Sequence, residues 1–202
     1  MTSIIDYGAG NIQSVKNALE ALGESAIITC DRHQILNADR VILPGVGAFG
    51  AAMTQINRRG LADTIRDAVQ SGIPFLGICL GLQVLFDSSE ESPGVPGLSL
   101  LPGAIVKIPD GPGVKIPHIG WNSLAFLKDC PLFSGIKNGE YVYFVHSFYL
   151  RAAQRADVAA TADYGVTMDV AVSRDNLFAT QFHPEKSGAA GLKMLRNFIG
   201  LH

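Results

Sequence analysis

Short apolar runs recur along the first half of the chain, each closed by glycine, proline or a polar turn residue. They predict strands over residues 3–8, 25–30, 40–45 and 73–79. The last run is apolar at consecutive rather than alternate positions, which indicates a strand buried on both faces. Stretches with helical periodicity separate the runs, so the pattern is that of a β-α repeat.

Four helices are predicted from apolar positions spaced three or four residues apart. The first follows Asn11, a residue type that caps helices, and another is expected over 80–86, directly after the fourth strand. The inward-facing positions in the other helices are Ile12, Val15, Leu19 and Leu22 in the first, Leu61, Ile65 and Val69 in the second, and Leu192, Leu195 and Ile199 in the last.

The middle of the chain has a different character. Residues 92–121 are dense in proline and glycine, which favours turns, hairpins and short strands. Further strands are predicted over 141–150, 157–161 and 170–183. Together these patterns predict one α/β domain over residues 1–202, with a mostly parallel central sheet flanked by helices and an antiparallel β insertion. In such sheets ligands bind near the carboxyl ends of the strands.

Composition and charge exclude several classes of protein. Hydrophobic residues make up 48% of the 202 residues, which suits a large core, an apolar surface for a partner, or both. A net charge of −2 with scattered basic residues gives no patch for nucleic acid or an anionic membrane. The most apolar stretch, 73–86, is too short to span a bilayer, and the N-terminus lacks the pattern of a signal peptide.

Three cysteines, Cys30, Cys79 and Cys130, are widely separated and include no CxxC pair. This spacing argues against a disulfide framework or a metal centre, and for a reducing compartment. We therefore expect a cytoplasmic protein. Cys30 and Cys130 have no distinctive neighbours and are expected to be core residues.

Cys79 differs because a glycine lies two residues to either side of it, in "GICLG". This segment joins a predicted strand to a predicted helix, and such a turn forces its central residue into a strained conformation with no room for side chains at the flanks. The thiol would then project above the sheet at a helix N-terminus, where a thiolate is favoured. A buried core cysteine is the alternative, and the segment alone leaves both open.

A base for such a thiol occurs at the end of the last predicted strand. In "QFHPE", residues 181–185, His183 can accept the thiol proton and Glu185 can orient the imidazole. Residues two apart point the same way in an extended segment, and Pro184 biases His183 toward that conformation. A surface histidine beside a carboxylate is the alternative, but the two motifs together supply a nucleophile, a base and an orienting group.

The motifs "GICLGLQ" and "QFHPE", in this order, resemble those of the class I glutamine amidotransferases. The resemblance implies a flavodoxin-like core and a glutaminase triad formed by Cys79, His183 and Glu185. The segments "DYGAGN" (6–11), "LPGVGAFG" (43–50), "HIGWN" (118–122) and "YFVHSF" (143–148) further resemble the glutaminase subunits of imidazole glycerol phosphate synthase.

The same resemblance assigns an oxyanion strand to the "PGVG" loop. Gly45, Val46 and Gly47 would form it, and the N–H groups of Val46 and Leu80 would be the two donors. The glycines let the Gly45–Val46 peptide rotate at low steric cost.

Substrate-binding positions are also implied by the resemblance. They are Gln83, Glu91, Ser147 and Phe148. Phe148 stands where the family often has tyrosine. For Gln83 and Glu91, the alternative is ordinary solvated polarity on a helix and a loop.

Finally, the resemblance implies no cofactor but a protein partner. Ammonia released from L-glutamine would pass to a separate (β/α)8-barrel synthase subunit, which 202 residues cannot also contain. There it would help to form imidazole glycerol phosphate and an aminoimidazole carboxamide ribotide. Candidate interface residues are Trp121, Tyr143 and Lys186, with core packing as the alternative for Trp121. Two other functions stay open: a subunit of another class I amidotransferase, and a non-catalytic module on the same fold.

Overall fold

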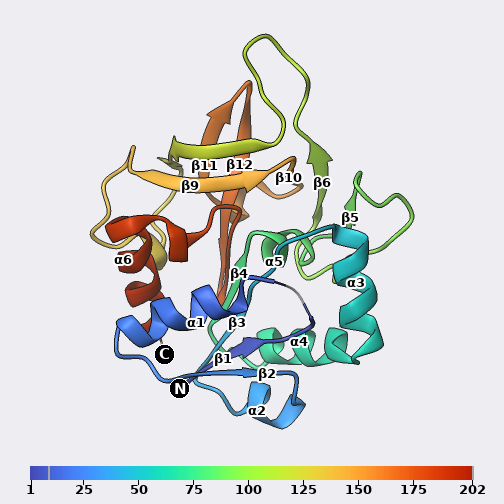
Figure 1. Ribbon diagram of the computed structural model, residues 1–202, viewed down its shortest axis with the longest axis vertical. Coiled ribbons are helices and arrows are strands. Elements are labelled where there is room, and N and C mark those ends of the chain that lie inside the picture. Colours follow the sequence, from blue (N-terminus) through green and yellow to red (C-terminus); the bar gives the residue numbers. More distant parts are fainter. Residues whose placement is uncertain (9, 202) are drawn as a thin grey trace.

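Five parallel strands form the centre of the computed structural model, which describes residues 1–8 and 10–201 (Figure 1). They are β1 (Thr2–Ile5), β2 (Ala26–Thr29), β3 (Arg40–Leu43), β4 (Phe75–Ile78) and β13 (Leu177–Thr180). Their order, β2-β1-β3-β4-β13, is that of a flavodoxin-like sheet, so the predicted parallel core is confirmed. Ala9 of the "DYGAGN" segment and the C-terminal His202 lie outside the described residues.

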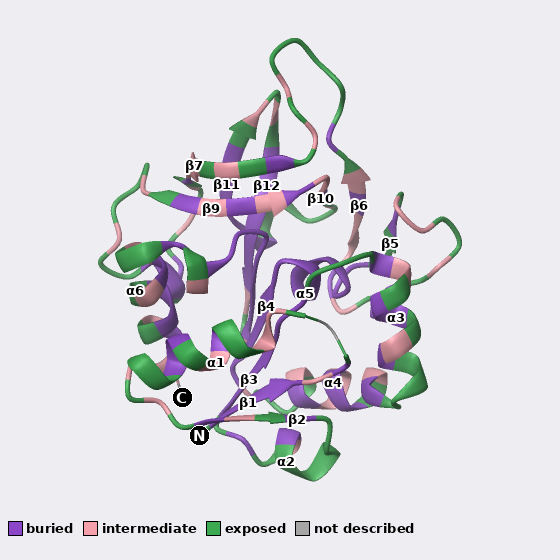
Figure 2. Cartoon of the chain, viewed as in Figure 1, coloured by how far each residue is buried: buried purple, intermediate pink, exposed green. Residues whose placement is uncertain are grey.

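Helices cover both faces of this sheet. They are α1 (Ile12–Ala21), α2 (Arg32–Leu36), α3 (Phe49–Arg58), α4 (Leu61–Gln70), α5 (Leu80–Gln83) and α6 (Gly188–Ile199), with short 3-10 turns η1 (Pro131–Phe133), η2 (Arg155–Asp157) and η3 (Pro184–Lys186). Apolar residues of α1 and α6 pack on one face, and those of α2, α3 and α4 pack on the other (Figure 1). The strands β1, β3, β4 and β13 are buried throughout (Figure 2), because consecutive side chains enter opposite cores, whereas the edge strand β2 is partly exposed.

The predicted antiparallel insertion is confirmed. The sheet continues from β13 through β12 (Val166–Arg174), β10 (Phe148–Ala152), β6 (Gly103–Lys107) and β5 (Ser88–Ser89), and β11 (Val158–Tyr164) joins β12 to β8 (Ala125–Phe126). The strands β7 (His118–Ser123) and β9 (Tyr141–His146) form a separate antiparallel pair. Two predicted strands are therefore each divided. The run 141–150 breaks at Ser147 into β9 and β10, and the run 170–183 breaks at a turn where Asp175 has φ 51°.

Several local predictions were wrong or incomplete. The stripe expected on the last helix was incomplete rather than misplaced: Leu192, Leu195 and Ile199 do pack against the core, and Met194 and Phe198 are buried beside them. The helix expected over 80–86 ends at Gln83, because the next carbonyls accept hydrogen bonds from residues 98–101 instead of continuing the helix. The helices α2 and α3 were not predicted, and Cys30 is exposed rather than buried.

Two close backbone approaches fix the turn that follows β4. A Cβ on Gly81 would lie 1.8 Å from the carbonyl oxygen of Leu43 on β3, and a Cβ on Gly77 would lie 2.8 Å from the carbonyl oxygen of Gly81. Both positions are therefore restricted to glycine by packing. The sequence-based expectation that side chains would clash at the flanks of Cys79 is confirmed, and the clashing groups are backbone.

Replacing Gly81 by alanine is expected to destabilise the fold by about 3 kcal/mol or more, since the rigid Leu43 carbonyl cannot move aside without distorting β3. Urea unfolding measures the change. Gly111→Ala serves as the control, because a Cβ there would make an ordinary 3.5 Å contact with Val114 and should change the free energy of unfolding by less than about 0.5 kcal/mol. Equal stability of the two variants would contradict the packing argument.

Candidate active site

Three neighbouring strands deliver the candidate residues to one place. β3, β4 and β13 are adjacent in the sheet, and their carboxyl ends lead to Gly45, Cys79 and His183 respectively. A cavity of about 420 Å³ opens there. Its lining includes the predicted residues Val46, Gly47, Cys79, Leu80, Gln83, Glu91, Ser147, Phe148 and Lys186. Residues from distant parts of the sequence therefore meet at the sheet edge where ligands of α/β folds bind.

Cys79 occupies the strained position of the β4–α5 turn. Its φ of 56° and ψ of −107° lie in a region that costs a non-glycine residue about 1–3 kcal/mol. Its N–H donates to the carbonyl of Thr180 at 2.7 Å, and its side chain is nearly buried while lining the cavity. The predicted strained turn is confirmed. The surrounding packing holds the thiol at the cavity wall.

His183 and Glu185 form a buried pair behind the cavity. Nδ1 of His183 lies 2.7 Å from Oε1 of Glu185, whose side chain is inaccessible to solvent. The expected extended geometry was wrong: Glu185 lies in the 3-10 turn η3, which begins directly after His183 and brings the carboxylate back to the ring. The backbone N–H of His183 donates to the carbonyl of Tyr143, so β9 helps to hold the imidazole.

Asn11 contacts this pair instead of capping α1. Its side chain makes no capping hydrogen bond, and its φ is 68°. Its Nδ2 donates to Oε1 of Glu185 at 2.6 Å. The same carboxylate oxygen thus accepts hydrogen bonds from both Asn11 and His183, which fixes its orientation.

Opposing effects set the pKa of His183. Burial lowers it, but the interactions of the imidazole with the Cys79 thiol and the Glu185 carboxylate raise it by more, to about 9. Nε2, the nitrogen that does not face Glu185, is buried without a hydrogen bond of good geometry among the described residues. In an unliganded site such a contact is often loose and tightens when substrate binds.

The "PGVG" loop engages one of the two candidate oxyanion donors through the carbonyl of Gly45. The N–H of Leu80 donates to the carbonyl of Gly45 at 3.2 Å, so it is not available to a ligand in this conformation. Gly47 has φ +111°, a conformation that favours glycine, and Val46 is partly exposed beside it. Rotation of the Gly45–Val46 peptide would withdraw the carbonyl and free Leu80.

The predicted substrate positions lie on the cavity wall in different ways. Gln83 is buried and its amide is engaged by the Phe148 carbonyl. Glu91 accepts a hydrogen bond from the N–H of Phe49 at 2.7 Å, at the start of α3. Ser147 and Phe148 connect β9 to β10 and place backbone along the opposite wall.

The candidate interface residues gather beside the cavity. Trp121 and Tyr143 face each other across the β7–β9 pair with ring centroids 6.1 Å apart, and Lys186 is exposed after Glu185. Trp121 is 55% exposed, which rules out core packing as its explanation. Ile119 and Tyr141, which sequence reasoning missed, are also exposed on this pair of strands.

Other polar residues near the site were missed, although they lie within the motifs "DYGAGN", "HIGWN", "YFVHSF" and "QFHPE". Gln181 is fully buried between Cys79 and Gln83. His118 and His146 contact each other at 3.0 Å, and burial lowers the pKa of each to about 4. Tyr7 is buried with its hydroxyl unpaired against Gly45, and burial, with a smaller contribution from Cys79, raises its pKa. The motifs could have drawn attention to these residues, but no local pattern shows which of them meet in the folded chain.

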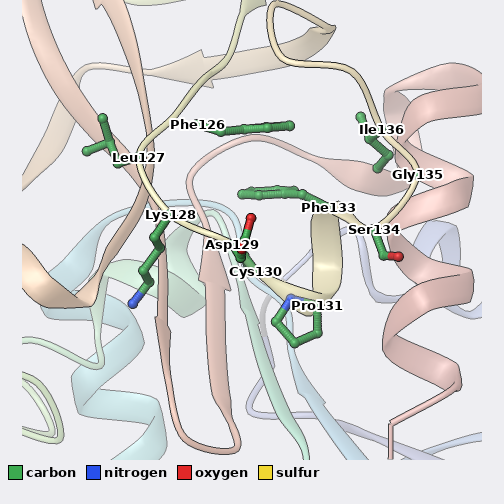
Figure 3. Close-up of a pocket in the computed structure, with 10 residues that line it drawn as sticks. All are labelled: Phe126, Leu127, Lys128, Asp129, Cys130, Pro131, Phe133, Ser134, Gly135 and Ile136. Carbon is green, nitrogen blue, oxygen red and sulfur yellow. The ribbon is translucent and has the colours of Figure 1, made fainter.

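A larger cavity, of about 850 Å³, lies elsewhere, along residues 126–136 (Figure 3). One continuous loop forms it, and the amine of Lys128 is engaged by the carbonyls of Ala156 and Ser173. The side chains that line this cavity come from one segment, whereas the cavity at the strand ends brings together a thiol, an amide and a carboxylate from distant segments. Within residues 1–8 and 10–201, no cluster of three or more metal-ligating side chains occurs, and no helix is long and apolar enough to cross a membrane.

Comparison with known proteins identifies the class. The family model described as "Glutamine amidotransferase class-I" matches residues 3–201. The chain therefore belongs to the class-I glutamine amidotransferases. A crystal structure of a glutamine amidotransferase (TM-score 0.75, 21% identity, 98% of this chain and 96% of that chain) and the structure of PurLQS from Thermotoga maritima (TM-score 0.73, 21% identity, 98% and 96%) share its fold.

Close relatives define the group within that class. The "Imidazole glycerol phosphate synthase subunit HisH" of Methanothermobacter thermautotrophicus is 52% identical over 98% of both chains. Those of Methanocaldococcus jannaschii (49% identity, 100% of both chains) and Geobacillus thermodenitrificans (48%, 100% of this chain and 96% of the relative) are similarly close. At this identity over the full length, the chain is a member of the HisH subunit family.

The raised pKa of His183 leads to a direct test by NMR. The ring of His183 should titrate near pH 9 in the wild type, and in Cys79→Ala its pKa should fall because the thiol contributions are lost while burial remains. Ring-labelled histidine followed from pH 5 to 10 measures both. The ring signal of His33, an exposed residue of α2, serves as the reference and should have the same chemical shift in the two proteins at any one pH. An unchanged His183 value would show that Cys79 does not interact with it.

Proposed function

We propose that this chain hydrolyses L-glutamine to glutamate and ammonia through a thioester on Cys79, and delivers the ammonia to a synthase subunit. The observation that carries the proposal is the convergence of Cys79, His183 and Glu185 at the ends of adjacent strands. The thiol lines a cavity, and the imidazole behind it is oriented by a buried carboxylate. This is the arrangement that nucleophilic catalysis by a thiol requires.

Acylation begins with the Cys79 thiolate. Its sulfur attacks the side-chain amide carbon of glutamine, a C–S bond forms, and the carbonyl electron pair moves onto oxygen. The His183 imidazolium, favoured near neutral pH by its pKa of about 9, gives its proton to the amide nitrogen. The C–N bond breaks, ammonia leaves, and a glutamyl thioester remains on Cys79 with a neutral His183.

Deacylation uses the neutral imidazole as the base. His183 takes a proton from water while the water oxygen attacks the thioester carbon. The C–S bond then breaks, glutamate leaves, and the thiolate and imidazolium are restored. Glu185 orients His183 and stabilises its charged form in both halves of the reaction, and it receives no proton itself.

The oxyanion formed in both steps needs donors that the resting conformation withholds. The Leu80 N–H is bound to the Gly45 carbonyl, and rotation of the Gly45–Val46 peptide would replace that carbonyl by the Val46 N–H. Two donors would then converge on the cavity. We assign the binding of the glutamine backbone and α-ammonium to the opposite wall, at Gln83, Glu91, Ser147 and Phe148.

The relatives are subunits of a synthase by name, which supports a protein partner for this chain. We propose a (β/α)8-barrel synthase subunit that docks on the exposed residues Ile119, Trp121 and Lys186 and on the half-buried Tyr143. Docking there is supported by position, since Tyr143 holds the backbone of His183 and Lys186 lines the cavity. Ammonia would enter the barrel without meeting bulk water, and would there help to form imidazole glycerol phosphate and the aminoimidazole carboxamide ribotide.

Glutamate release, assayed with and without the barrel subunit and its nucleotide ligand, tests the proposed function. The isolated chain should be slower by at least a factor on the order of 10²–10³, because each oxyanion donor that the resting conformation withholds costs that much. Cys79→Ala should be inactive in both conditions. Equal turnover with and without the partner would contradict the resting blockade. Failure of a glutamine-analogue electrophile to modify Cys79 in the complex would favour a non-catalytic module.

Trp121→Ala should weaken binding of the barrel subunit by roughly 30-fold, the effect of losing an anchor worth about 2 kcal/mol. The side chain is largely exposed, so the isolated chain should keep its stability. Calorimetric titration measures the affinity. Leu127→Ala is the matched control, since Leu127 is 47% exposed but lies away from the β7–β9 pair, and it should leave the affinity unchanged. Equal binding by both variants would place the interface elsewhere.

A further inference from the structure

Gln181 lies at the end of β13, fully buried, with its amide between two residues of the proposed site. Its Nε2 is 3.7 Å from Sγ of Cys79, and its Oε1 is 3.1 Å from Nε2 of Gln83. Its own backbone N–H is held by the carbonyl of Val170 at 2.8 Å. A buried amide without hydrogen-bond partners would be costly, and the Gln181 amide finds its partners in Cys79 and Gln83. Its contacts therefore go beyond apolar packing.

The carbonyl of Phe148 sets the direction of these hydrogen bonds. A carbonyl oxygen can only accept, so the Gln83 atom 3.2 Å from it is the amide nitrogen. The same nitrogen faces Gln181, which must therefore turn its oxygen toward Gln83 and its N–H toward the sulfur. Both N–H groups of Gln83 are used in this way, and its Oε1 is the atom left to face the cavity.

Two buried histidines anchor the Phe148 carbonyl in turn. Nδ1 of His146 lies 2.8 Å from it and so must carry a proton. Burial keeps both rings neutral at pH 7, so Nε2 of His146 accepts from Nδ1 of His118 at 3.0 Å. His146, from this histidine pair, and Gln83 therefore both donate to the Phe148 carbonyl. Gln83 also donates to Gln181, and Gln181 donates to the sulfur of Cys79.

We propose that Gln181 is a further residue of the glutaminase reaction: its N–H stabilises the Cys79 thiolate, and its carbonyl holds Gln83 with an acceptor facing the substrate. The inference rests on the proposed function of the site. A hydrogen bond to sulfur favours the charged, nucleophilic form. A fixed Gln83 contributes to substrate binding without first losing side-chain freedom.

Gln181→Met tests both contacts, because methionine is similar in length but has neither an amide N–H nor a carbonyl. In the full chain, alkylation of Cys79 by iodoacetamide is followed against pH by peptide mass spectrometry, which separates it from the exposed Cys30. The midpoint of the pH profile should rise, and alkylation below the midpoint should become about tenfold slower. In the complex with the barrel subunit, KM for glutamine should rise several-fold.

Thr161→Val is the matched control, since Thr161 is a buried polar residue of the same sheet, on β11. It should change neither the pH midpoint nor KM. Thermal unfolding checks that the variants are folded, and Gln181→Asn, too short to span both contacts, replaces Gln181→Met should that variant not fold.

An unchanged pH midpoint in a folded variant overturns the contact with sulfur, and an unchanged KM overturns the positioning of Gln83. Failure of the proposed function itself would look different. The wild-type complex would then release no glutamate, whereas the alkylation profiles of wild type and variant could still be compared.

Discussion

The contact between Gly81 and the carbonyl of Leu43 is the constraint on which the site depends. Because these two segments of the backbone approach so closely, the start of α5 packs against the end of β3. The turn between β4 and α5 can therefore follow only one path. On that path Cys79 takes a conformation that a cysteine would not adopt in a free chain. The energy for this strain comes from the large apolar cores on both faces of the sheet.

The same contact region also includes the proposed oxyanion donors. The Leu43 carbonyl, which packs against Gly81, is only two residues before the Gly45 carbonyl, which accepts the hydrogen bond of the Leu80 N–H. Strand packing and the resting state of the site are therefore properties of one short stretch. The part up to Gly45 is buried, whereas Val46 and Gly47 are exposed, so few contacts would oppose the proposed rotation of the Gly45–Val46 peptide. The proposed partner subunit, docked beside them, would need to change only a local conformation.

Burial gives the polar groups of the site their character. Glu185, His183, Gln181 and Gln83 lie in an interior where each hydrogen bond is electrostatically stronger than in water and each missing one is costly. The fixed carbonyl of Phe148 determines which way the Gln83 amide points, and the carbonyl of Tyr143 holds the backbone of His183. A chain of this kind holds its geometry before substrate arrives, which is what preorganised catalysis requires.

Much of the parallel core was predictable, because strands buried on both faces and amphipathic helices have strong periodic signals. The antiparallel half was less so. A continuous apolar run such as 141–150 does not reveal that Ser147 divides it between two sheets, since that depends on partners far away in the sequence. The helix expected over 80–86 was too long for the same reason, as residues 98–101 take the carbonyls that would have continued it.

The sequence by itself determined the chemical groups of the candidate site and the glycine spacing around Cys79, because these are properties of residue type and local backbone. Only the tertiary structure decided that Asn11 contacts Glu185 rather than capping α1, that Gly45 blocks Leu80, and that Gln181 links Cys79 to Gln83. Each of these contacts joins residues that are far apart in the chain. The order of strands in the sheet brings them together, and no local pattern encodes that order.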